Sequence, residues 1–215
     1  MIALYPGAYK PPHSGHFEIA SSLLKGMQGR VYNVDNYKDA GPSALSKDSD
    51  TSVKVDKVVV FIGAGERNGI TQAQSEAIWK IYQKYIPNLE IVTSVKNPMI
   101  EARDYAAANP NEEFYAITGI RGEEDFVKKT PNVKGLAVTS KDNSEVRATN
   151  FRKAILSGNL DLIRDFFPKE VSSEEILKIL NMLKSTIVSE QMKQKLEEVM
   201  TDIFVSEEVV EEGTS

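Results

Sequence analysis

Hydrophobic residues fall into two alternating patterns along the chain, and this alternation predicts strands separated by helices. The clearest continuous run is Val58–Ile62, whose β-branched and aromatic residues are typical of a strand covered on both faces. Similar runs predict strands at residues 2–5, 89–93, 113–118 and 133–138. Between them, the pattern predicts helices at 16–25, 71–85, 98–108, 123–128 and 149–156.

Local signals mark where these helices begin and end. Thr71 and Gln74 have the spacing of a capping box at the start of the second helix. Asn109 and Pro110 stop the third helix, and Gly158 ends the last one.

Strands that alternate with helices in this way favour βαβ units and a parallel sheet covered by helices. The sequence therefore predicts an α/β fold, a Rossmann-like, doubly wound, five-stranded parallel sheet with C-terminal helices. We assign residues 1–165 to this α/β domain and interpret 33–56, rich in Asp, Ser and Lys, as a polar insertion. Residues 166–204 are expected to form a helical region, and 205–215 an acidic flexible tail.

Two helices are expected between residues 172 and 203. Ser172 and Glu175 form a second capping box. An apolar stripe at spacings of four, three and four follows, formed by Met192, Leu196, Val199 and Ile203. Such a stripe suits docking on the domain or on a partner helix, so a homo-oligomer is one possible state.

Composition and charge remove several function classes. The chain of 215 residues has no cysteine, which excludes disulfides, thiolate metal sites and cysteine nucleophiles. The net charge of −5 gives no general attraction to nucleic acid, and no apolar stretch is long enough for a membrane helix. The N-terminus has no signal-peptide pattern. We therefore expect a cytoplasmic protein (in the host cytoplasm if it comes from a phage) with neither nucleic acid nor a membrane as partner.

The candidate chemistry lies in the turn after the first predicted strand. The two histidines of the chain, His13 and His16, are three residues apart, just where a helix begins. Helix N-termini and the carboxyl ends of parallel strands both favour anionic ligands. Gly7 and Gly15 would let the backbone approach a phosphate, and Lys10 would add a positive charge. The alternative is that both histidines are ordinary loop and cap residues.

The turn resembles the H-x-G-H signature of the nucleotidyltransferase superfamily, which includes nicotinamide-mononucleotide adenylyltransferases and phospholipid-precursor cytidylyltransferases. The matching residues are Gly7, Tyr9, Pro11, His13, Gly15 and His16, and Ala8 lies within the motif. Lys10 replaces the usual aspartate or glutamine, a form similar to small phage members. The resemblance implies that His13, His16 and Lys10 act on the phosphates, and that Gly7, Ala8, Tyr9 and Gly15 bind the nucleotide.

A second segment is similar to the I-S-x-T-x-x-R signature of the same superfamily. It is Val146–Arg152, in which Arg147 stands where serine is usual. Thr149 is expected to be the N-cap of a helix and Arg152 to lie in its first turn. The resemblance assigns Thr149 and Arg152 to the β- and γ-phosphates of the nucleotide.

Two further loops are weaker candidates. Arg67 and Asn68 follow a central strand and would contact the acceptor, although an ordinary strand-to-helix turn explains them equally well. Gly119 and Arg121 follow the fourth strand, where the superfamily reads the base and ribose.

The implied reaction is transfer of AMP from ATP to a small phosphate-bearing acceptor, with nicotinamide mononucleotide as first choice and pyrophosphate as by-product. Mg²⁺ is expected on the ATP phosphates, since no carboxylate cluster forms a dedicated metal site. The alternatives are a CTP-dependent cytidylyltransferase and a nucleotide-binding protein without turnover that serves assembly.

Overall fold

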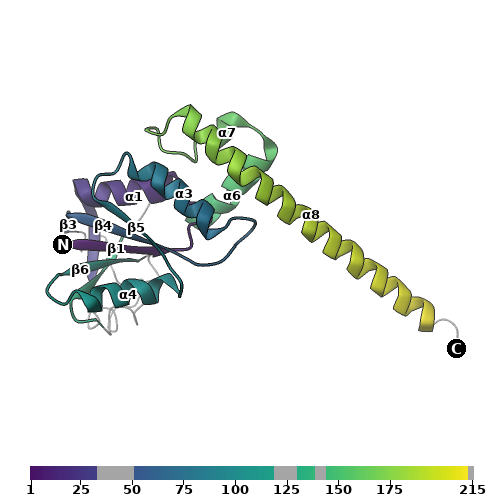
Figure 1. The fold of residues 1–215 in the computed structure, drawn as a ribbon, viewed down its shortest axis with the longest axis horizontal. Coiled ribbons are helices and arrows are strands. Elements are labelled where there is room, and N and C mark those ends of the chain that lie inside the picture. The colour runs from purple at the N-terminus through teal and green to yellow at the C-terminus, as the bar shows by residue number, and fades with distance from the viewer. Residues whose placement is uncertain (33–50, 119–129, 139–143, 213–215) are drawn as a thin grey trace.

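A seven-stranded, mostly parallel sheet forms the centre of the computed structural model, which describes residues 1–32, 51–118, 130–138 and 144–212 (Figure 1). The strand order is β3-β2-β7-β6-β1-β4-β5. The strands are β1 Ile2–Gly7, β2 Met27–Tyr32, β3 Thr51–Val53, β4 Lys57–Ile62, β5 Leu89–Thr93, β6 Phe114–Thr118 and β7 Val133–Ala137. The helices are α1 Ser14–Lys25, α3 Gln72–Gln83, α4 Pro98–Ala108, α6 Ser144–Ser157, α7 Leu160–Arg164 and α8 Ser173–Glu212.

Five of these strands are parallel and lie where the hydrophobic runs predict them, but the predicted total of five is wrong. β2 runs antiparallel to β7, and β3 runs antiparallel to β2. β2 includes Gln28 and Arg30 and lacks a continuous apolar run, whereas β3 has three residues. The polar insertion predicted at 33–56 is therefore partly wrong: Val53 and Val55 are buried, and residues 33–50 lie outside the described residues.

Successive residues of the central strands face opposite layers, which gives the sheet two separate cores. On one face, Tyr5 and Val60 belong to the core that contains Phe17 of α1 and Trp79 of α3. On the other face, Leu4, Val59 and Phe61 pack with Ala102 and Ala106 of α4. Figure 1 shows this division, with α1 and α3 on one side of the sheet and α4 on the other. The fold class is therefore mixed α/β.

β1 lies at the point where the chain changes direction across the sheet. Among the parallel strands, β4 and β5 follow on one side of β1, and β6 and β7 then follow on the other. Ligands of open α/β sheets bind beyond the carboxyl ends of the strands at such a reversal. The turn after β1 leads into the two histidines, with His13 as the N-cap of α1 and His16 in its first turn.

A single helix, α8, replaces the two helices predicted for 172–203, and it continues through much of the predicted tail to Glu212. No glycine or proline interrupts residues 173–212, so nothing in the sequence breaks the helix. Its first turns bury an apolar row, and its distal part runs away from the domain (Figure 1). The row is Ile176, Ile179, Leu180, Leu183 and Ile187.

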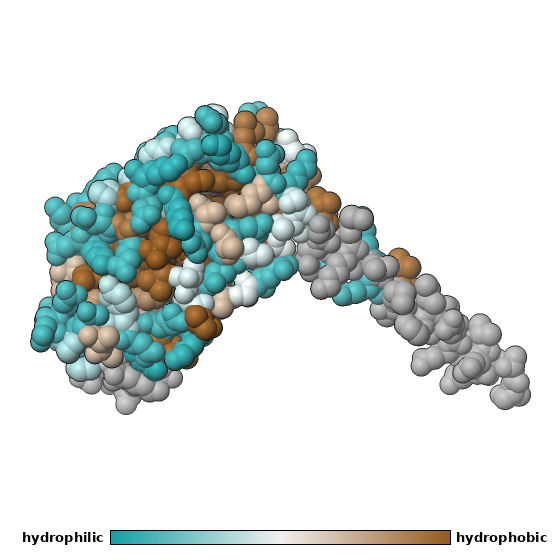
Figure 2. All heavy atoms as spheres, viewed as in Figure 1, coloured by the Kyte–Doolittle hydropathy of each residue, from teal (hydrophilic) through white to brown (hydrophobic). Residues whose placement is uncertain are grey.

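The apolar stripe predicted further along α8 is described only at Val199, which is 54% exposed. The side chains of Met192, Leu196 and Ile203 lie outside the described residues. On the face in Figure 2, hydrophilic residues dominate and hydrophobic ones show mainly between the helices, over the sheet of Figure 1.

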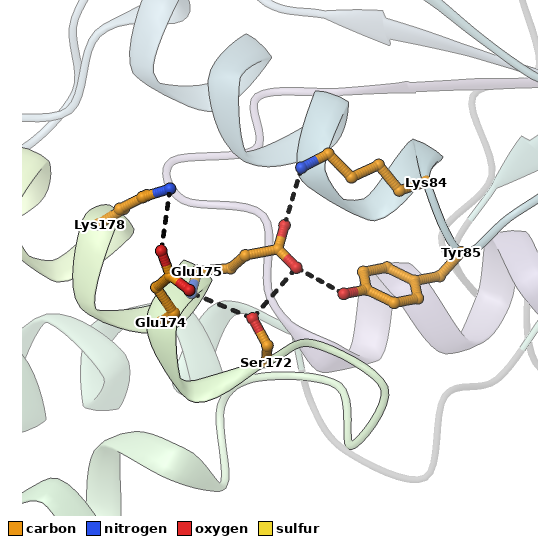
Figure 3. Close-up of polar contacts among 6 residues, drawn as sticks. All are labelled: Lys84, Tyr85, Ser172, Glu174, Glu175 and Lys178. Carbon is orange, nitrogen blue, oxygen red and sulfur yellow. Dashed lines mark hydrogen bonds and ion pairs between the residues drawn. The ribbon is translucent and has the colours of Figure 1, made fainter.

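Polar contacts fix the start of α8 against α3 (Figure 3). The Glu175 carboxylate accepts hydrogen bonds from Lys84 Nζ at 3.1 Å and Tyr85 Oη at 2.5 Å. The Tyr85 hydrogen bond is the main cause that lowers the pKa of Glu175. Within the predicted capping box, the Glu175 amide donates to Ser172 Oγ at 3.2 Å, which confirms Ser172 as the N-cap.

Candidate functional site

A cavity of about 580 Å³ opens at the carboxyl end of β1. It gathers every predicted site residue that the structure describes, from three separate parts of the chain. These residues are Gly7, Ala8, Tyr9, Lys10, His13, Gly15, His16, Arg67, Asn68, Thr149 and Arg152. Gly119 and Arg121 lie outside the described residues.

The two histidines cap helix α1 with their own side chains. His13 is the N-cap residue, and its Nδ1 accepts a hydrogen bond from the Gly15 amide at 3.0 Å. In return, His16 Nδ1 accepts from the His13 amide at 3.1 Å, which completes a reciprocal capping box made of imidazoles. The alternative interpretation of the histidines as helix-cap residues is therefore correct in part, since both residues cap the helix and also line the cavity.

This capping fixes the tautomer of both rings. Because each Nδ1 accepts a hydrogen bond from a backbone N–H, the ring proton of each neutral imidazole is on Nε2. The rings are stacked, with centroids 3.9 Å apart and planes at 29°. Each ring therefore carries one N–H donor that the helix cap does not use.

Gly15 is required by the ring above it. A Cβ at position 15 would lie 2.9 Å from His13 Cε1, closer than real contacts allow. The glycine of the H-x-G-H motif thus makes room for the N-cap imidazole.

The expectation that the N-terminus of this helix offers backbone N–H groups to an anionic ligand is wrong. The Ser14 amide donates to Phe166 O at 2.8 Å, and the Phe17 amide donates to His13 O at 3.2 Å. The amides of Gly15 and His16 are engaged by the His13 side chain. A ligand in the cavity would therefore meet imidazoles and cationic side chains rather than the open end of α1.

The loop after β1 is held in a strained conformation by its neighbours. Tyr9 has a backbone φ of +52°, in a region that residues other than glycine seldom adopt. Its hydroxyl donates to Tyr5 O at 2.7 Å, its carbonyl accepts from Ser75 Oγ, and its ring packs edge-on to His16 and Trp79. The ring also covers Gly7, where a Cβ would lie 2.9 Å from Tyr9 Cζ. Tyr9 therefore orients the loop from beneath.

Lys10 joins the loops after β1 and β4. Its buried ammonium donates to Ala8 O at 2.8 Å and to Gly63 O at 2.9 Å. Burial and, to a smaller extent, the charge of Arg67 lower the pKa of Lys10 to about 8. The Lys10 ammonium, which the sequence predicts to bind a phosphate, is therefore already hydrogen-bonded to two backbone carbonyls.

Arg67 projects from a tight hairpin turn. Arg67 and Ile70 exchange backbone hydrogen bonds of 3.0 and 3.1 Å. Between them, Asn68 and Gly69 both have positive φ, at +54° and +78°, which is the requirement of a type I′ turn. The Asn-Gly pair thus explains how Arg67 is held at the mouth of the cavity.

Arg152 reaches the histidine turn from α6. Its Nη1 donates to Lys10 O at 3.1 Å and its Nη2 to Thr149 Oγ1 at 3.3 Å. The predicted cap geometry is wrong, because α6 begins at Ser144 and so Thr149 and Arg152 lie inside the helix. Residues 139–143, just before the helix, lie outside the described residues.

Three cations converge at this end of the cavity. The charge of Arg67 is a secondary cause, after burial, that lowers the pKa values of both Lys10 and Arg152. Among the residues that the structure describes, none of these three has an ion pair with a carboxylate. A cluster of like charges without counter-ions is costly in the free protein and favours an anionic ligand.

Sequence reasoning missed the apolar wall of the cavity and the supports behind it. Ile19, Ile117, Val138 and Ala148 line the wall and come from four different elements or their ends. Each reads as ordinary core in the sequence, because nothing local marks which apolar side chains face a cavity. The role of Ser75 beneath Tyr9 likewise depends on a contact across 66 residues.

A second cavity of about 540 Å³ lies next to the first. The two share Ala8, Lys10 and Arg67 as lining residues. The second cavity is bounded further by the ends of β4 and β5 and the start of α4, at Gly63, Ala64, Glu66, Val95, Lys96, Asn97 and Pro98. Lys10 and Arg67 thus line both spaces.

Comparisons with known proteins add no relative. No protein-family model matches this chain, and no curated protein shows a significant match to it. Within the described ranges, no helix combines the length and apolar character that a bilayer span requires. The described residues also contain no group of three or more histidine, aspartate or glutamate side chains placed to hold a metal ion.

Proposed function

We propose that this protein is a nucleotidyltransferase that moves AMP from ATP to a small phosphate-bearing acceptor. The observation that carries the proposal is the meeting of two Nε2–H imidazoles with Lys10, Arg67 and Arg152 around one cavity. The strand order of the parallel part also suits a Rossmann-like interpretation, in which the reversal at β1 positions the nucleotide.

The reaction follows from what these groups can do. An acceptor phosphate oxygen would attack the α-phosphorus of ATP, form a new P–O bond and break the bond to the β-phosphate, so that pyrophosphate leaves. The attacking oxygen is already ionised, so no general base is required. His13 and His16 would donate from Nε2 to phosphate oxygens as charge develops there, and the three cations would stabilise the departing pyrophosphate.

The acceptor would lie in the second cavity, with Arg67 between the two substrates. Arg67 faces both spaces, and Lys96 adds a cation to the second one. Positive side chains on both sides of the junction favour an acceptor that carries a phosphate, such as nicotinamide mononucleotide. Mg²⁺ would enter as part of the MgATP substrate.

Pyrophosphate release tests this function. Purified protein is incubated with MgATP or MgCTP and with nicotinamide mononucleotide or other phosphomonoesters. Release that requires both ATP and nicotinamide mononucleotide is the expected result. Release with CTP but not with ATP would show that the protein is a cytidylyltransferase. Nucleotide binding without release for any acceptor would contradict the transferase function and indicate a nucleotide-binding protein without turnover.

A further inference from the structure

The corner between α7 and α8 lies against both halves of the candidate site. The corner, residues 164–168, contacts α1 because Phe166 O accepts from the Ser14 amide at 2.8 Å and Asp165 O from Ser14 Oγ at 3.4 Å. It contacts α6 because the Phe166 ring stacks on Phe151, with centroids 4.9 Å apart and planes at 6°. Phe151 is fully buried and precedes Arg152 in the chain.

Arg164 gives this corner its shape. Its guanidinium donates to four carbonyl oxygens, those of Phe167 at 3.4 Å, Pro168 at 3.0 Å, Lys169 at 3.1 Å and Val171 at 3.4 Å. Phe167 also packs edge-on to Phe151, at 5.1 Å between centroids. A planar fork of donors can hold several carbonyls at once, which a lysine ammonium on a flexible stem does less well.

We propose that the corner is a positioning element for the candidate site, in which the Phe166 carbonyl fixes the first turn of α1 and Arg164 holds the backbone that follows Phe166 in place. Ser14 lies between the two histidines, so its amide determines where the helix begins relative to both imidazoles. The same corner supports Arg152 through Phe151. The histidine turn and Arg152 are thereby held in register by residues that touch neither cavity.

Ser14 offers a precise test of the hydrogen bond. Proline is well tolerated at the first helical position, and His13 has the extended backbone (φ −128°, ψ −178°) that a residue before proline prefers. Ser14→Pro therefore removes the donor to Phe166 O while the helix can still start. Ser14→Ala keeps this amide and removes the hydroxyl, so it is the matched control.

The first readout is the imidazole spectrum, which does not depend on the proposed function. The chain has two histidines, so ¹H–¹⁵N correlations of the ring nitrogens report on this turn directly. Ser14→Pro should shift or broaden both sets of ring signals well beyond the change in Ser14→Ala. Matching spectra in the two variants would overturn the proposal.

Arg164 provides the second test and covers the outcome in which Ser14→Pro does not fold. Arg164→Ala should perturb the same imidazole signals, Arg164→Lys should restore them in part, and Arg103→Ala on α4 should leave them unchanged. Undisturbed signals in folded Arg164→Ala would contradict the role of the corner.

Turnover is the readout that rests on the proposed function. If the wild-type protein releases pyrophosphate, Ser14→Pro and Arg164→Ala should lower kcat by about tenfold or more with a smaller change in KM, because misplaced groups lose transition-state contacts first. No release in the wild type would defeat the transferase, while the spectra would still decide on the corner.

Discussion

At the scale of single residues, each histidine ring serves two purposes through its two nitrogens. Nδ1 caps the helix, and this use leaves the proton on Nε2. Loss of a histidine therefore removes a cap and an imidazole that lines the cavity together, so substitution by alanine alone does not separate the two effects. A substitution that keeps the cap and removes the imidazole separates the two effects.

His16→Gln is a substitution that keeps the cap and removes the imidazole, because glutamine at the third helical position completes a capping box by itself. The melting temperature should stay close to that of the wild type, whereas His16→Ala should lose about 1 kcal/mol of unfolding free energy. Turnover should fall by about 100-fold or more in both variants, since both lack the imidazole that would donate to the phosphate. Thermal melts and pyrophosphate release measure the two effects. Wild-type turnover in His16→Gln would contradict the role of the imidazole.

Lys10 makes stability depend on pH in a defined direction. Its pKa is about 8 in the folded protein against 10.5 ordinarily, so the unfolded chain binds more protons between these values. The unfolding free energy should therefore rise with pH from about 8 to 10.5, and this contribution is lost as the pH falls through about 8. Urea unfolding across this range should show a smaller rise in Lys10→Met. An identical slope in the two proteins would contradict the buried environment of Lys10.

At the scale of elements, the sequence predicts those whose signals are local. The apolar run Val58–Ile62 predicts β4 by its composition alone, and the capping box of Thr71 and Gln74 predicts the start of α3. The sequence does not predict β2, because Gln28 and Arg30 interrupt its apolar pattern and its place depends on pairing with β7 far along the chain. The predicted start of α6 at Thr149 is wrong, because the site signature resembles a helix cap but lies inside a helix that begins at Ser144.

The candidate site divides in the same way. Motif spacing predicts the histidine turn and Arg152, whereas the prediction for Arg67 depends on its place after a central strand, and all of these residues line one cavity. Tertiary contacts determine the rest, such as the occupation of the Ser14 amide by Phe166 O and the use of the Lys10 ammonium by Gly63 O. Neither partner is marked in the sequence, since any residue can supply a backbone carbonyl.

The turn that presents Arg67 provides the element-scale prediction. Arg67→Gln removes the charge and leaves the Asn-Gly turn intact, so the fold should survive. The Kd for ATP should rise by about tenfold, equivalent to about 1.4 kcal/mol, with Arg103→Gln as the control for loss of a surface charge. Calorimetric titration of ATP with each variant checks this. Equal affinities for ATP in both variants would remove Arg67 from the site.

At the scale of the whole molecule, α8 has a proximal part that packs on the domain and a distal part that runs away from it (Figure 1). The first turns bury Ile176, Leu183 and Ile187, and Gln74 Nε2 of α3 donates to Thr186 Oγ1 at 3.0 Å. Beyond this region the helix runs away from the domain (Figure 1). The proximal part therefore belongs to the packed body.

Truncation should separate the two parts. A chain that ends after Val188 should keep the melting temperature and the turnover of the full chain, because the buried row of α8 is intact. A chain that ends after Asp165 lacks Phe166 and should lose both. Circular dichroism melts and pyrophosphate release on the two products test this. Loss of folding in the longer product would show that the distal helix stabilises the domain.

The hydrogen bond from Ser14 to Phe166 also orders events in time. A ribosome releases the histidine turn first and the α7–α8 corner some 150 residues later, since Ser14 and Phe166 are 152 positions apart. Strand β1 precedes the histidine turn, and the strands β2 to β7 are synthesised between Ser14 and Phe166. A nascent chain can thus assemble its sheet while the first turn of α1 still lacks its carbonyl partner. Ligand binding would then be among the last properties that a newly made molecule acquires.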